Sequence, residues 1–150
     1  SYVIELVREF AKDLVWAQDL YTLKNQVYVT STQYHRMYVL NGKVDMAITD
    51  SPLLLGLLYG DYPASYKPYL LDLHNTFNNL NIFIERKVPF EQEGRQQNEI
   101  EAIDKDREIK NILTENNIEF IIYNELFSYE SLRKLSLNII DHYNRINESR

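Results

Sequence analysis

The chain has 150 residues, 45% of them hydrophobic, which suits one globular domain with a sizeable core. Its formal net charge of −6 argues against general nucleic-acid binding, because phosphate contacts need a basic face, and the lack of cysteine excludes disulfides and thiolate catalysis. No apolar run reaches the ~18 residues that a membrane-spanning helix needs. We therefore predict a single domain over residues 1–150 of a soluble, cytoplasmic protein that has no membrane partner.

The first third of the chain alternates between strand and helix patterns. A β-branched, apolar run predicts a strand over residues 2–7, and a short helix follows over 8–17. Helical spacing of apolar residues then predicts a long helix over 24–40, which the Asn-Gly pair at 41–42 ends. The nearly continuous apolar run at 44–49 predicts a second strand, covered on both faces as strands of parallel sheets are.

The middle of the chain repeats this alternation. A Ser-Pro pair at 51–52 predicts the start of a short helix over 53–58, because proline is favoured at the first helical position. Another helix is expected around residues 66–78, and the apolar run within NLNIFIER predicts a third strand over 79–86. The polar segment that follows is expected to become helical from about residue 98.

The last third completes the pattern and defines the predicted fold class. The helix from residue 98 is expected to stop at the two asparagines 116–117, before a fourth strand over 118–123 and a final helix over 128–146. Strands that alternate with helices in this way imply right-handed crossovers and a parallel sheet. We predict an α/β three-layer sandwich with a mainly parallel sheet of about four strands, whose ligands bind beyond the carboxyl ends of the strands.

Four stretches of the sequence carry a family resemblance. They are ELVREFAKDLVW at 5–16, GKVDMAITDSPLLL at 42–55, NLNIFIER at 79–86 and EGRQQNEIEAIDKD at 93–106. Together they resemble the P-loop kinase-like proteins of tailed bacteriophages, which are similar to the nicotinamide riboside kinases. The resemblance implies ATP and Mg²⁺ as cofactors, a nucleotide or nucleoside as ligand, and the cytoplasm of an infected host as location.

The sequence departs from this family in its phosphate-binding loop. Proteins of the family begin with a strand, a G-x-x-x-x-G-K-[ST] loop and a helix, but glycine occurs here only at positions 42, 56, 60 and 94. The resemblance therefore implies a kinase-like domain whose first βα unit is missing, and a non-catalytic binding or regulatory module as its function. The alternative is an ATP- and Mg²⁺-dependent nucleotide or nucleoside kinase whose phosphate loop comes from a missing segment or a partner chain.

Three candidate site residues lie in the first half of the chain. The resemblance gives Asp50 the roles of catalytic residue and Mg²⁺ ligand, and it gives Glu9 and Arg36 contacts with the acceptor substrate. Each position also has an ordinary structural explanation. An aspartate before Ser-Pro is common in turns, a glutamate in the first turn of a helix is favoured by the helix dipole, and Arg36 suits a solvated helix face.

The remaining candidates flank the segment that resembles the family's lid. The resemblance makes Arg95 a catalytic clamp on phosphate and Arg86 and Gln97 substrate-binding residues. Guanidinium groups suit such a role, because they match phosphate oxygens in bidentate geometry. On composition alone this segment is an ordinary solvated loop. The three histidines, His35, His74 and His142, are too scattered for a zinc site and are expected on the surface or in the core.

The missing βα unit has a consequence for the predicted sheet. In the family fold its strand lies between the strands at 44–49 and 79–86. We therefore expect these two strands to pair directly, or a homodimer or a protein partner to complete the sheet, because orphan amide groups inside a sheet are not tolerated.

Overall fold

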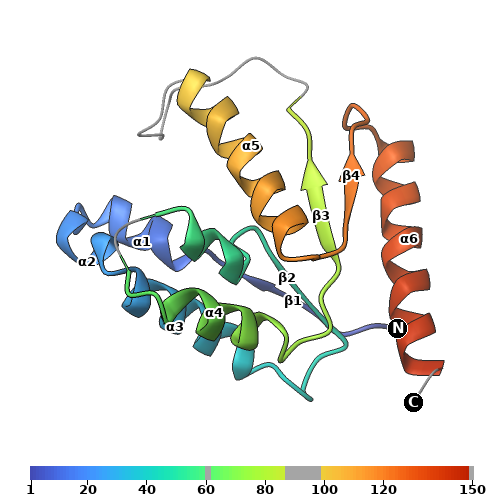
Figure 1. Cartoon of the computed structure of the whole chain (residues 1–150). Helices are drawn as coiled ribbons and strands as arrows, with labels where there is room; N and C mark the ends of the chain where they lie inside the picture. The colour runs from blue at the N-terminus through green and yellow to red at the C-terminus, as the bar shows by residue number, and fades with distance from the viewer. Residues whose placement is uncertain (60–61, 87–98, 149–150) are drawn as a thin grey trace. The chain divides into compact units, whose positions relative to one another are not determined.

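The structure is a computed structural model that describes residues 1–59, 62–86 and 99–148. The chain forms two compact units, Ser1–Asn78 and Asn79–Arg150, which we call unit 1 and unit 2 (Figure 1). The prediction of a single domain over residues 1–150 stays a prediction. Each unit combines one pair of parallel strands with helices.

The sheet of unit 1 consists of two short parallel strands. β1 (Ile4–Val7) pairs with β2 (Met46–Thr49), in a register that places Leu6 beside Ile48. The side chain of Asp45 accepts a hydrogen bond from the amide of Val3 at 2.7 Å, which fastens the amino-terminal end of the pair. Both strands therefore end at the same edge, where the chain leaves each strand for its next segment.

The described residues of unit 1 also form five helical segments. They are α1 (Phe10–Trp16), α2 (Leu20–Lys24), α3 (Gln26–Tyr38), the 3₁₀ helix η1 (Leu53–Leu57) and α4 (Tyr66–His74). The single helix predicted over 24–40 is wrong at its start, because Asn25 leaves helical geometry and its side chain accepts from the amide of Tyr28 to begin α3. The predicted Asn-Gly turn is confirmed, with Gly42 at φ 72°.

The core of unit 1 lies between α3, η1 and α4. Leu53, Tyr66 and Leu70 form its buried hydrophobic cluster, and Leu70 has no exposed surface. The hydroxyl of Tyr66 lies 2.6 Å from that of Thr30 and donates to the carbonyl of Gln26 at 3.2 Å. Because these buried polar groups satisfy one another, α3 is fixed to α4 by hydrogen bonds as well as by apolar packing.

Unit 2 is built around a second pair of parallel strands. β3 (Asn81–Ile84) pairs with β4 (Phe120–Tyr123), and α5 (Glu99–Glu115) and α6 (Tyr129–Glu148) flank the pair in Figure 1. The buried hydroxyl of Tyr123 donates to Ser131 at 2.7 Å, which ties β4 to the start of α6. Among the described residues, no helix combines the length and the apolar character needed to cross a membrane.

The predicted three-layer sandwich with one sheet of about four strands is wrong, and with it the P-loop kinase-like fold lacking its first βα unit that the resemblance implied. All four strands are present and run parallel within their pairs, but they form two separate two-stranded sheets. The expected direct pairing of the strands at 44–49 and 79–86 is also wrong, because β2 pairs with β1 and β3 with β4. Hydrophobic patterns identify a strand but do not name its neighbour, which depends on contacts distant in sequence.

Coverage of the strands differs from the prediction for the same reason. Each strand of unit 1 has one paired neighbour, and its side chains are not buried on both faces. Leu6 is 69% exposed and Ile48 is 48% exposed, side by side in the register of β1 and β2. The apolar run at 44–49 was therefore a correct indication of a strand and a wrong indication of its burial.

Candidate functional site

The candidate site lies in unit 1, where β1 and β2 end. Glu9 lies two residues beyond β1 and Asp50 directly follows β2, so parallel pairing brings both acids to one edge. Glu9 is half-buried, and its pKa is raised, first by burial and then by the negative charge of Asp50. Lys12 opposes this shift and Asp13 adds to it. We call these two carboxylates the Glu9–Asp50 pair.

One buried side chain from α3 joins the two strand ends. Gln33 is 3% exposed, and its amide oxygen accepts from the backbone amide of Phe10 at 3.0 Å. Its amide nitrogen donates to the hydroxyl of Thr49 at 3.3 Å, and the same hydroxyl accepts from the amide of Ser51 at 3.1 Å. The residues next to Glu9 and Asp50 are thus hydrogen-bonded to the same glutamine.

Arg36 lies one turn further along α3 and is held by its own neighbours. One guanidinium nitrogen forms an ion pair with Asp13 at 2.8 Å, and another donates to the carbonyl of Arg8 at 3.1 Å. The guanidinium carbon lies 5.1 Å from the centre of the Phe10 ring. The predicted acceptor-binding arginine is therefore neutralised by Asp13, and a ligand anion would have to compete with that carboxylate.

Arg86 lies in unit 2, two residues beyond β3, and is also engaged. Its guanidinium contacts both carboxylate oxygens of Asp106, at 2.6 and 3.1 Å, and this hydrogen bonding raises the pKa of Arg86. Lys110 of α5 pairs with Glu85 beside it at 3.1 Å. The predicted role of Arg86 in phosphate binding stays a prediction, and Arg95 and Gln97 lie outside the described residues.

The described residues offer limited means of holding a metal ion. They contain no group of three or more His, Cys, Asp or Glu side chains that could bind one. The Glu9–Asp50 pair supplies two carboxylates, whereas Mg²⁺ takes six oxygen ligands and usually keeps several waters. The predicted Mg²⁺ role of Asp50 stays a prediction, and the ligand would have to supply further oxygens.

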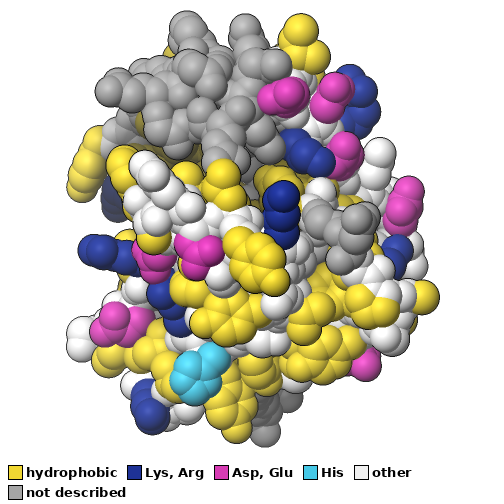
Figure 2. Space-filling model, turned by 90° about the vertical axis from the view of Figure 1, so that its left-hand side faces the viewer, with side chains coloured by type: hydrophobic (Ala, Val, Ile, Leu, Met, Phe, Trp, Pro, Cys, Tyr) yellow, Lys and Arg dark blue, Asp and Glu magenta, His cyan; other side chains and the backbone are white. Residues whose placement is uncertain are grey.

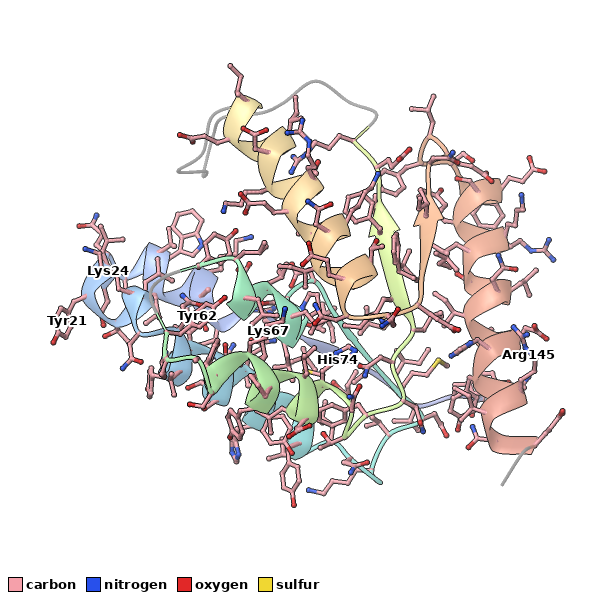
Figure 3. All side chains as sticks on the ribbon, viewed as in Figure 1. Tyr21, Lys24, Tyr62, Lys67, His74 and Arg145 are labelled. Atoms are coloured by element: carbon pink, nitrogen blue, oxygen red, sulfur yellow. The ribbon has the colours of Figure 1, made fainter. Side chains whose placement is uncertain are left out.

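Two of the histidines lie on helices of unit 1, His35 on α3 and His74 on α4. His74, at the end of α4, is 5% exposed, and burial lowers its pKa, so the predicted core alternative applies to it (Figure 3). His35 is exposed on α3.

A second feature of unit 1 is an exposed apolar surface on α1 and α2. Trp16 is 72% exposed and Tyr21 is 90% exposed. Figure 3 shows Tyr21 and Lys24 pointing outward at the end of α2, and Figure 2, which views the side where α2 lies, shows hydrophobic side chains across its lower half. Exposed aromatic residues of this kind are enriched at protein interfaces.

Gln33 and Thr49 were not predicted as site residues. Gln26, Thr30 and Gln33 follow one another at helical spacing, and a polar stripe of this spacing indicates a solvated helix face. All three are buried instead. A stripe of glutamine and threonine without charged residues was the available signal, since uncharged polar side chains can be satisfied inside a protein.

A scan of the sequence against protein-family models found no match, and searches of curated proteins and of solved structures found none either. The resemblance to P-loop kinase-like proteins therefore stays a prediction.

Proposed function

We propose that this chain is a non-catalytic binding module for a nucleoside or nucleotide, whose sugar end meets the Glu9–Asp50 pair. The observation that carries this proposal is a half-buried carboxylate with a raised pKa beside a second acid, where two parallel strands end. Ligands of parallel sheets bind beyond this edge, and shifted pKa values gather at functional sites.

The charges around the pair favour a sugar over a phosphate. Ionised carboxylates only accept hydrogen bonds, so they suit the hydroxyl groups of a ribose and repel phosphate oxygens. The guanidinium of Arg36, which was predicted to contact the ligand, is paired with Asp13. A nucleoside is therefore the ligand class that the site accommodates at the lowest electrostatic cost.

The two glycines that the structure describes do not form a phosphate cradle, and this supports the non-catalytic part of the proposal. Gly42 lies in the turn before β2, and Gly56 is buried within η1 against Thr30 and Tyr66, so neither belongs to a loop between a strand and a helix. Preorganised donors of a phosphate loop are worth ~3–4 kcal/mol each in transition-state stabilisation. Without them, phosphoryl transfer would be slower by many orders of magnitude.

A second candidate function is an ATP- and Mg²⁺-dependent nucleoside kinase whose phosphate loop is supplied by another segment or a partner chain. The position of Asp50, between a strand and a 3₁₀ helix, favours it, because acids there serve the metal of bound nucleotides in such kinases. A homodimer or a protein partner would be required. The exposed side chains of Leu6, Ile48 and Trp16 support such an association.

Isothermal titration calorimetry with the common nucleosides, their monophosphates and Mg²⁺–ATP tests the proposal. We expect a nucleoside to bind the wild-type protein, and Glu9→Gln or Asp50→Asn to weaken it. Asp72→Asn on α4 is the matched control, since it removes an exposed negative charge of unit 1. A ligand at 100 times its dissociation constant should also add ~2.7 kcal/mol to the free energy of unfolding.

Two outcomes would contradict this proposal in different ways. If no nucleoside or nucleotide binds, the chain is not a module of this kind. If Mg²⁺–ATP is consumed and a phosphorylated nucleoside appears, the kinase alternative replaces the non-catalytic one.

A further inference from the structure

We propose that Gln33 is the positioning residue of the candidate site, because its amide holds the loops after β1 and β2 at a fixed separation and so sets the distance between Glu9 and Asp50. The inference deepens the proposed function and rests on it for the statement that this pair meets the ligand. The geometric claim itself concerns only unit 1 and can fail separately.

Gln33 binds each of the two loops at a residue next to one of the acids. Phe10, which directly follows Glu9, donates its backbone amide to the side-chain oxygen of Gln33. Thr49, which directly precedes Asp50, accepts from the side-chain nitrogen of Gln33. Each acid is therefore one residue away from a group that Gln33 binds.

The loop around Asp50 has a hydrogen bond of its own that involves Thr49. The hydroxyl of Thr49 also accepts a hydrogen bond from the backbone amide of Ser51, which links the two residues on either side of Asp50. That oxygen receives its other hydrogen bond from Gln33. Losing the Gln33 amide would thus alter the hydrogen bonding of the backbone that carries the Asp50 carboxylate.

The helix that carries Gln33 is fixed in place by hydrogen bonds of its other polar side chains. On the same helix, Thr30 is hydrogen-bonded to Tyr66, and Gln26 donates to the carbonyl of Leu23 at 2.8 Å. Gln33 is itself buried, so losing its bonds would remove the side-chain acceptor of the Phe10 amide and leave the hydroxyl of Thr49 with its bond from the amide of Ser51. A side chain fixed in this way can hold two loops in register.

The requirement for glutamine follows from the donor and acceptor that one planar group must offer at once. Methionine has nearly the same length and offers neither, which makes Gln33→Met the direct test. Thr49→Val removes the shared oxygen with little change in volume, and Thr49→Ser restores it. Gln26→Met is the matched control, because it replaces a buried glutamine of the same helix that does not bind the two loops.

The experiment follows the carboxyl carbon of Glu9 by NMR during a pH titration, with and without Asp50→Asn. Asp50, Lys12 and Asp13 are the charged groups that act on Glu9, and removing the Asp50 charge should lower the pKa of Glu9 in the wild-type protein. We expect this response to disappear in Gln33→Met and Thr49→Val and to persist in Thr49→Ser and Gln26→Met. Amide spectra show in each case whether the variant is folded.

Nucleoside affinity gives the second measurement. Residues that orient a ligand-binding side chain are typically worth about 10-fold or more in affinity, and we expect a ~10-fold higher dissociation constant in Gln33→Met. The inference is overturned if Asp50→Asn lowers the pKa of Glu9 equally in the wild type, Gln33→Met and Thr49→Val, even where a nucleoside binds. Loss of the response in these two variants without nucleoside binding to the wild type would instead overturn the proposed function alone.

Discussion

The two units have similar strand pairs but differ in the interactions between their side chains. Each surrounds a parallel pair of four-residue strands with helices. Unit 1 builds an apolar centre from Leu53, Tyr66 and Leu70. The described part of unit 2 instead carries most of the ion pairs, which are Arg86–Asp106, Lys105–Glu108, Arg107–Asp104, Lys110–Glu85, Lys134–Glu125 and Arg145–Asp141.

This difference indicates where a ligand site can be held firmly. Exposed ion pairs contribute little to stability, because water competes for both partners, whereas buried apolar groups and satisfied buried hydrogen bonds fix positions. The side chains that surround the Glu9–Asp50 pair are anchored through α3 to the centre of unit 1. The arginine of unit 2 predicted to bind phosphate is used within that unit.

The largest effect is expected from Leu70→Ala. Leu70 has no exposed surface, so truncation should lower the free energy of unfolding by about 2–5 kcal/mol. Leu137→Ala on α6 is the control, since Leu137 is 52% exposed and should cost only about 0.5 kcal/mol. Urea denaturation measures both, and equal losses would remove the contrast between the units.

A smaller, pH-dependent effect is expected from Glu9→Gln. The pKa of Glu9 is raised above its ordinary value of 4.5, so the folded state binds this proton more tightly than the unfolded state does. The free energy of unfolding therefore falls as the pH rises from the unfolded pKa through the folded one. Glu9→Gln should stabilise the protein at about pH 7 and lose this advantage in acid, below the unfolded pKa.

Urea denaturation of the wild type and Glu9→Gln at both pH values measures this difference. Asp72→Asn, which removes an exposed acid of α4, is the control variant measured at the same two pH values. An advantage of equal size in acid and at neutral pH would mean that ionisation of Glu9 is not its source.

The smallest effect is expected from Asp106→Asn in unit 2. The Arg86–Asp106 pair is bidentate but partly solvated, with 40% and 26% of the two side chains exposed. Its loss should cost at most about 1 kcal/mol and less at high salt. A double-mutant cycle with Arg86→Met measures the coupling, and a value well above 1 kcal/mol that salt does not change would show a buried, structural pair.

Local features of the fold could be predicted from the sequence. The four strands appear where β-branched and apolar runs predicted them, and Gly42 forms the expected turn. The failures concern relations between distant segments. The pairing of β2 and the exposure of Ile48 depend on what lies beside the strand, and a hydrophobic pattern contains no such information.

In the candidate site too, local relations could be predicted from the sequence, and relations between distant segments could not. Glu9 and Asp50 interact, as residues that follow adjacent parallel strands should, although their roles in binding stay predictions. The engagement of Arg36 by Asp13 depends on the angle at which α1 meets α3, which no spacing rule provides. Gln33 was missed because a polar helix stripe looks the same in sequence whether water or a loop satisfies it.

The shortness of β4 and the openness of its side chains have a practical consequence. The segment IEFIIY at 118–123 is rich in β-branched and aromatic residues, and Ile121 and Ile122 remain open to water. Six-residue stretches of this composition stack into cross-β fibrils when many copies meet. Concentrated samples should aggregate through this stretch, and a lysine in place of Ile122 should act as a gatekeeper against fibril growth.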